Sequence, residues 1–151
     1  MEYGEELSKN TVANAQALGA ALAAEGFDVL AESRGYTASH QVLTRHGEID
    51  SGAGATAAAL LEEAGIITNM NMLPGDTKAM TPSGLRLGVQ ELTRVGMGPR
   101  EMEEVASFYS RVLLKQEDAT TVKHDVSHLK SEFQHVQYCF DSEDTLAYEG
   151  M

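Results

Sequence analysis

Glycine ends one apolar segment after another in this chain, which limits it to short helices and strands in alternation. The longest such segment, residues 5–25, is rich in alanine and repeats leucine or valine at roughly helical spacing. Gly26 follows it as a C-terminal cap. Residues 51–64 form a second predicted helix, with Leu60 and Leu61 on its buried face.

Short β-branched or glycine-bounded runs predict the strands, which lie at 27–30, 41–44, 66–68 and 84–88. The stretch 69–82 has little periodicity and contains two prolines, so it is predicted to be a loop. A third helix is predicted over 100–115, a fourth around Val126 and Leu129, and a last strand at Tyr138–Phe140. This order predicts an α+β fold in which helices cover a small, largely antiparallel sheet.

Charge and length exclude several classes of protein. The chain has 151 residues, enough for one ordinary domain, and a formal charge of -12. Nucleic-acid and anionic-membrane partners are not expected, because both need clustered cations. No apolar run approaches a membrane span, no secretory signal follows Met1, and the single Cys139 excludes an internal disulfide. We expect a cytoplasmic protein.

The strongest chemical signal is Arg86, which stands between two glycines in the sequence Gly-Leu-Arg-Leu-Gly. Glycines remove side-chain bulk, so a ligand can approach the guanidinium closely. An arginine fork matches a carboxylate through two parallel hydrogen bonds. Taken alone, the same pattern also fits a surface strand residue that pairs with an acid. Both interpretations stay open at this point.

A longer pattern surrounds this arginine. The string "NMNMLPGDTKAMTPSGLRLGVQELTRVG", residues 69–96, resembles the signature of serine hydroxymethyltransferases, in which N-x-N-x-x-P precedes S-G-x-R-x-G. Upstream, "YGEELSKNTVANAQALGAALAAEGFDVL" is similar to the helix and strand that open the family's small C-terminal domain, and "GYTASHQVLT" to its Gly-Thr-x-x-His segment. Within the family, these sequence segments are most similar to archaeal-type members and their threonine-transaldolase-like relatives. The resemblance covers residues 1–118 and leaves 119–151 as a C-terminal extension with an acidic tail.

The resemblance implies a fold like the C-terminal domain of fold-type I pyridoxal phosphate (PLP) enzymes. It also implies roles for five residues. Arg86 matches the arginine that binds the α-carboxylate of the amino-acid substrate. Asn71, with the neighbouring Met72 and Leu73, matches the folate-binding loop. His40 matches the histidine of the family's Gly-Thr-x-x-His segment. Asn71 is alternatively a loop amide that satisfies its own turn, and His40 a structural residue on a strand edge.

No segment is similar to the family's PLP-binding large domain, and no lysine lies in a Schiff-base context. We therefore expect the small subunit of a two-chain enzyme, inactive alone, whose partner chain holds PLP as electron sink. The expected reaction is aldol-type, a hydroxymethyl or aldehyde transfer on glycine, serine or threonine-like amino acids. Tetrahydrofolate or another tetrahydropterin is a candidate carrier of the one-carbon group. We expect the two chains to form a hetero-oligomer. The alternative is a non-catalytic interaction or regulatory module derived from that domain.

The C-terminal extension carries one further pattern. His124, His128, Glu132 and His135 follow one another at steps of four, four and three, which would place them on one helix face. Imidazole and carboxylate groups at that spacing can hold zinc. The favoured interpretation is a solvated polar face opposite the apolar residues of the same helix, with no metal site.

Overall fold

The computed structural model describes residues 3–139 and confirms the α+β class. Four strands form one sheet in the order β1-β2-β4-β3, and every neighbouring pair is antiparallel. The elements, in chain order, are α1 (Gly4–Ala24), β1 (Asp28–Val29), the 3-10 helix η1 (Glu32–Arg34), β2 (Gln41–Arg45), α2 (Ala53–Glu63), β3 (Asn69–Asn71), β4 (Gly84–Gly88), α3 (Gln90–Arg94), α4 (Pro99–Leu113) and α5 (Ala119–Glu132). None of these helices is long and apolar enough to cross a membrane.

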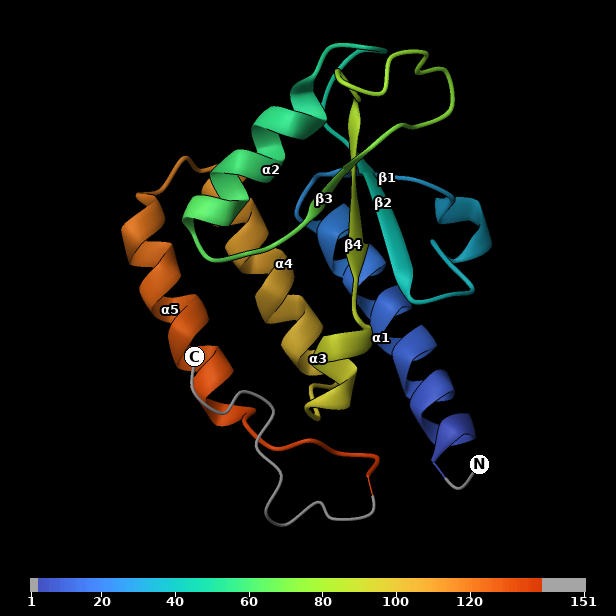
Figure 1. Ribbon diagram of the computed structural model, residues 1–151, viewed down its shortest axis with the longest axis vertical. Coiled ribbons are helices and arrows are strands. Elements are labelled where there is room, and N and C mark those ends of the chain that lie inside the picture. The colour runs from blue at the N-terminus through green and yellow to red at the C-terminus, as the bar shows by residue number, and fades with distance from the viewer. Residues whose placement is uncertain (1–2, 140–151) are drawn as a thin grey trace.

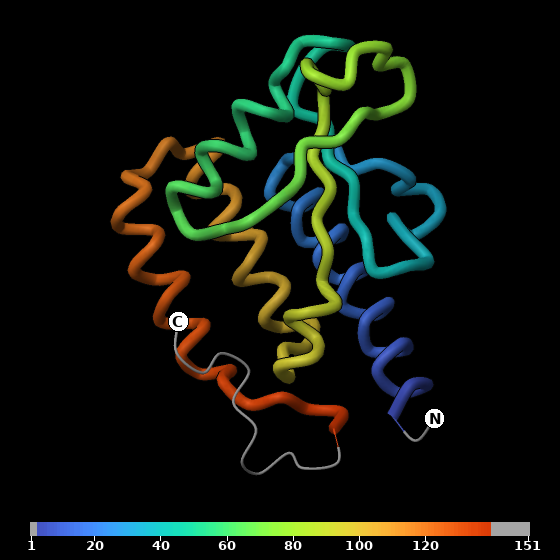
Figure 2. Tube along the Cα trace, in the orientation of Figure 1, coloured from blue at the N-terminus to red at the C-terminus, as the bar shows by residue number. Residues whose placement is uncertain are grey.

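The helices form a layer behind the sheet (Figure 1). α1 and α4 pack side by side, and α5 packs on α4 and α2 at the outer end of this layer. The trace in Figure 2 shows α5 following α4 back along the layer, so the predicted C-terminal helix lies against the preceding elements. Its Val122, Val126 and Leu129 are buried in the common core. The division of the chain after residue 118 stays a prediction.

The core face of the sheet carries one polar cluster among its apolar side chains. Thr44 of β2, Tyr109 of α4 and His46 meet there, with Oγ1, Oη and Nε2 atoms 2.8–3.0 Å apart. Phe27 packs edge-on against the Tyr109 ring, 4.8 Å between centroids. Burial lowers the pKa of His46 to about 4 and raises that of Tyr109 above its ordinary value. His46 is therefore neutral at pH 7, and the three groups satisfy one another's hydrogen bonds.

Several predicted elements differ from the structure. The β-branched run 66–68 forms no strand, and Ile67 is 77% exposed. The strand lies instead at Asn69–Asn71, inside the predicted loop, because those residues pair with β4. Leu60 was placed on the buried face of its helix, but it is 43% exposed, whereas Leu61 is fully buried. At these positions, pairing and packing in the tertiary structure outweigh the secondary-structure preference of the local sequence.

Two more differences lie further along the chain. The short helix α3 was not predicted. The predicted last strand is absent at Tyr138 and Cys139, which form a bend, and Phe140 lies outside the described residues, as does the acidic tail.

Candidate functional site

Arg86 lies in the middle of β4 with a paired strand on each side. Its Cα partners are Leu43 on β2 and Asn69 on β3. Side chains alternate between the faces of a strand, so the flanking Leu85 and Leu87 enter the core, where they are 0% and 5% exposed. Arg86 points to the opposite face and is half-buried. The predicted strand thus positions the arginine on a rigid element at the centre of the sheet.

A hollow of about 210 Å³ lies at this guanidinium, and we call it the arginine hollow. Two of the predicted site residues, Arg86 and His40, line it together. The side chain of Arg86 makes no hydrogen bond or ion pair with any other residue between 3 and 139. The residues that line the hollow are His40, Gln41, Ile67, Thr68, Asn69, Arg86, Gly88 and Gln90.

The chemistry of this lining suits an anion. It contains one permanent cation and three amide side chains, and none of the described residues that line it is Asp or Glu. Arg86 differs in this from Arg45, Arg94 and Arg111, each of which forms an ion pair with an acid. A carboxylate placed here would gain a charge-assisted pair of hydrogen bonds that the protein itself does not supply. The arrangement therefore fits recognition of a small carboxylate.

The two glycines that flank Arg86 in the sequence do not both open space for a ligand, and this expectation is wrong at Gly84. A Cβ atom there would clash with Cγ of Leu73, so the buried Leu73 side chain already fills that position. Gly54 of α2 also packs against the Gly84 backbone. These contacts close the Gly84 end of the strand, and the hollow lies at its Gly88 end.

The loop between β3 and β4 is held in shape by Asp76, which the sequence analysis did not single out. One carboxylate oxygen accepts hydrogen bonds from Leu73 N at 2.9 Å and from Ser83 N and Oγ at 2.9 and 2.8 Å. The other accepts one from Asp50 N at 2.8 Å. The bond from Asp50, followed by those from Leu73 and Ser83, holds the pKa of Asp76 far below its ordinary value. An aspartate just after a Pro-Gly turn is the signal that would have found this role.

Asn71, Met72 and Leu73 lie at the start of that loop and do not line the arginine hollow. Asn71 Nδ2 donates to the carbonyl of Met72 at 2.6 Å, and Leu73 N is already bonded to Asp76. The Met72 side chain is 40% exposed, while that of Leu73 is buried. The structure therefore separates these three residues from Arg86 and His40, and their predicted role in binding a pterin stays a prediction.

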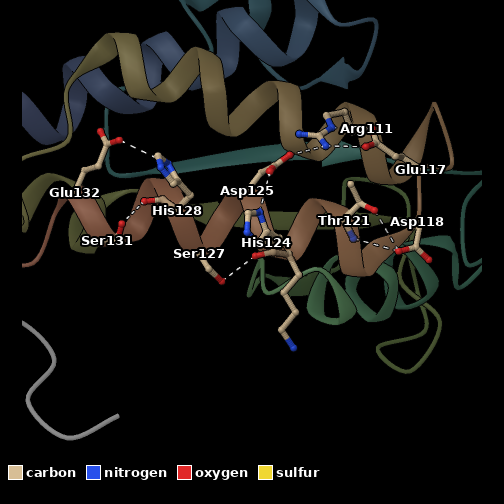
Figure 3. Close-up of polar contacts among 11 residues, drawn as sticks. Arg111, Glu117, Asp118, Thr121, His124, Asp125, Ser127, His128, Ser131 and Glu132 are labelled. Atoms are coloured by element: carbon tan, nitrogen blue, oxygen red, sulfur yellow. Dashed lines mark hydrogen bonds and ion pairs between the residues drawn. The ribbon is translucent and has the colours of Figure 1, made fainter.

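The histidine pattern on the C-terminal helix does not gather on one helix face, because α5 ends at Glu132 and His135 lies beyond it. Figure 3 shows His128 beside Glu132 and His124 beside Asp125, at 3.7 and 3.4 Å. Among residues 3–139, no three His, Cys, Asp or Glu side chains are placed to share a metal ion.

The side of α5 that faces α4 is held to that helix by ion pairs. Arg111 of α4 donates two hydrogen bonds of 2.7 Å to Glu117 and forms an ion pair of 2.8 Å with Asp125 (Figure 3). The hydrogen bonds to Glu117, and then those to Asp125, raise the pKa of Arg111. This cluster ties α5 to α4, whereas the guanidinium of Arg86 has no such partner in the described part of the chain.

Comparison with known proteins gives a consistent result over the chain. The sequence profile of a family described as serine hydroxymethyltransferase matches residues 2–109. The serine hydroxymethyltransferase of Pyrococcus abyssi is 53% identical over 143 residues, which cover 93% of this chain and 34% of that protein. The one from Methanocella arvoryzae is 49% identical over 149 residues, covering 97% of this chain and 34% of that protein. This chain thus spans about a third of the length of these relatives.

A similar structure is also known. The crystal structure of L-threonine transaldolase from Pseudomonas fluorescens matches with a TM-score of 0.82 and 29% sequence identity. The match covers 92% of this chain and 31% of that chain. The fold described above is therefore one domain of a larger architecture in that protein.

Proposed function

The chain belongs to the serine hydroxymethyltransferase family, and from this premise we propose that it is the amino-acid-binding part of a PLP-dependent transferase. In this role Arg86 holds the α-carboxylate of a glycine, serine or threonine-like substrate. The observation that carries the proposal is the guanidinium of Arg86, half-buried in a polar hollow and unpaired with any residue from 3 to 139. An arginine paired with a neighbouring acid would have supported the purely structural alternative.

The geometry suits a positioning role. Arg86 is fixed by ladder pairing on both sides of β4, so its fork is presented from a rigid strand. Two parallel hydrogen bonds to a carboxylate fix the orientation of the substrate as well as its place. Holding a reactant in one orientation lowers the entropic part of the barrier to reaction. The contribution of this chain is to bind and orient the amino acid, and no bond-breaking group is assigned to it.

The residues of this chain do not fit a PLP site of their own. All five lysines, at positions 9, 78, 115, 123 and 130, are exposed, and none lines the arginine hollow. An exposed lysine is a poor nucleophile at neutral pH because it stays protonated. We propose that a separate PLP-binding chain completes the site over the hollow and that this chain is inactive without it. That the chain spans about a third of its relatives supports a missing partner of this kind.

The proposed reaction is an aldol-type transfer, of a hydroxymethyl group or of an aldehyde, on the bound amino acid. Its two forms correspond to the names of the relatives, serine hydroxymethyltransferase and L-threonine transaldolase. In this proposal His40, which lines the hollow, contacts the substrate or the partner's cofactor. A tetrahydropterin carrier would lie towards Asn71, Met72 and Leu73.

The test is Arg86→Ala in the complex with the PLP-binding chain. Loss of a bidentate, charge-assisted pair costs about 2–5 kcal/mol, so glycine affinity should fall by about 30-fold or more. The absorbance change of the cofactor on adding glycine measures it. Arg86→Lys keeps the charge but loses the fork, and should recover only part of the affinity.

Arg100→Ala is the matched control, because Arg100 is an exposed arginine at the start of α4 that does not line the hollow. It should bind glycine like the wild type. An Arg86→Ala complex with unchanged glycine affinity would remove Arg86 from the site. The two-chain arrangement has its own test: the tagged chain should co-purify with a larger, yellow PLP-binding protein and should be colourless and inactive without it.

A further inference from the structure

Gln90, the first residue of α3, fills the space left by the second glycine of the Arg86 strand. A Cβ atom at Gly88 would lie 2.7 Å from Oε1 and 3.2 Å from Nε2 of Gln90. The carboxamide therefore lies directly over the Gly88 backbone, two residues along β4 from Arg86. Any side chain at position 88 would displace it. The missing side chain of Gly88 thus makes room for a protein amide in the arginine hollow.

We propose that Gln90 is a second ligand of the substrate carboxylate, donating a hydrogen bond from Nε2 beside the guanidinium of Arg86. The inference rests on the proposed function of Arg86. A carboxylate offers about four acceptor positions, and one arginine fork occupies two of them. A neutral amide fills a further position and adds no second charge to the hollow. Gln90 makes no side-chain hydrogen bond with another residue in the described part of the chain, so its donor is available.

The position of Gln90 also distinguishes it from the other amides of the hollow. Gln90 and His40 both line a second, mostly apolar hollow of about 390 Å³ against α1. They therefore stand at the boundary between the polar hollow around Arg86 and an apolar surface. A carboxamide at this boundary marks where the charged head group of a ligand ends, while the charge of Arg86 gives the site its preference for a carboxylate over an uncharged amide.

The experiment uses the 151-residue chain and follows the side-chain signals of Gln90 (Nε2) and Arg86 (Nε) by nitrogen-15 NMR. Glycine is the probe, and glycinamide, which has no carboxylate, is its control. In the wild type, glycine should shift both signals with the same dissociation constant, and glycinamide should shift neither. The probe is titrated to concentrations well into the millimolar range, because only part of the site is present.

Two variants at position 90 measure the contribution of the donor. Gln90→Glu keeps the shape but replaces the donor by an anion, and should weaken glycine binding by about tenfold or more. Gln90→Ala should weaken it by about three- to tenfold. Gln16→Ala is the matched control, since Gln16 is an exposed glutamine of α1 outside the hollow. It should bind glycine like the wild type.

Gly88→Ala tests whether the position of the Gln90 carboxamide matters. It keeps glutamine at position 90, but the added methyl group displaces the carboxamide from its place over residue 88. It should weaken glycine binding about as much as Gln90→Ala. The double variant should be no weaker than either single variant, since both remove the same contact. A purely structural role for Gly88 would give additive losses.

The outcomes separate this inference from the proposed function. If glycine shifts the Arg86 signal but not that of Gln90, or if Gln90→Glu binds glycine like the wild type, the role of Gln90 is wrong and that of Arg86 stands. If Arg86→Ala also binds glycine like the wild type, or glycine shifts neither signal, the proposed function fails together with the inference.

Discussion

The two faces of the sheet differ in how their polar groups are paired. On the core face, Thr44, His46 and Tyr109 are buried or half-buried, and each bonds to the other two. On the other face, Arg86 and Gln90 border a hollow and make no side-chain hydrogen bond within the described residues. Only the 2-residue alternation of a strand separates these two environments. The polar groups that stabilise the fold have their hydrogen bonds satisfied inside the core. The polar groups beside the rigid strand that lack such partners are available to hydrogen-bond a ligand.

The first prediction compares two adjacent residues of β4 that face opposite ways. Leu85→Ala should lower the free energy of unfolding by about 2–5 kcal/mol, because Leu85 is fully buried and its loss leaves a cavity. Arg86→Ala should change it by less than about 0.5 kcal/mol, because the guanidinium makes no hydrogen bond or ion pair with residues 3–139. Urea unfolding followed by circular dichroism measures both. Equal losses at the two positions would show that Arg86 serves the fold.

The second prediction concerns the acid response of the core face. The pKa of His46 is about 4 in the folded chain and about 6.5 when unfolded, so between these values the unfolded chain binds an extra proton. Stability should therefore fall as the pH drops from about 6.5 to 4, by at most about 1.4 kcal/mol per pH unit. The half-buried Asp76 carboxylate, whose pKa is lowered by its hydrogen bonds, adds to this loss only below about pH 5.

His46→Gln removes the titrating group and should flatten the unfolding free energy between about pH 6.5 and 5, above the range in which the carboxylates titrate. The measurement is urea unfolding at a series of pH values for both proteins. Parallel curves for wild type and variant would assign the acid response to other groups.

The third and smallest effect is expected at Tyr109. Tyr109→Phe removes one hydroxyl from the core cluster but leaves Thr44 and His46 bonded to each other at 2.9 Å. It should lower the free energy of unfolding by about 1–2 kcal/mol. Tyr36→Phe is its control, because the Tyr36 hydroxyl has only a 3.5 Å contact with Glu32 at the surface. Thermal unfolding of the two variants should differ clearly, and equal melting temperatures would mean that the core cluster adds no stability.

Sequence patterns located most elements but not their pairing. α1, α2 and α4 follow the predicted ranges closely, and α5 contains the predicted Val126 and Leu129, since apolar spacing and caps are local signals. β3 was misplaced by three residues, because its position depends on pairing with β4 and not on β-branched composition. α3 is only five residues long and has too few positions to show a helical period.

The candidate site was predicted in part. Arg86 and His40 were named from the sequence, and they line the same hollow although 46 positions separate them. Gln90 was missed, because nothing in its neighbourhood indicates that its amide folds back over Gly88. Asp76 was missed for a similar reason, since its hydrogen-bond donors come from as far away as Asp50 and Ser83.

The sequence by itself determined the class of the fold, the family and the arginine most suited to a carboxylate, because periodicity, caps and motif spacing are written along the chain. Only the tertiary structure decided which polar groups are paired and which are free. The physical reason is that pairing depends on distances between residues far apart in the sequence. Arg111 and Arg86 are both arginines within predicted elements, yet the fold brings Glu117 and Asp125 to the first and no acid to the lining around the second.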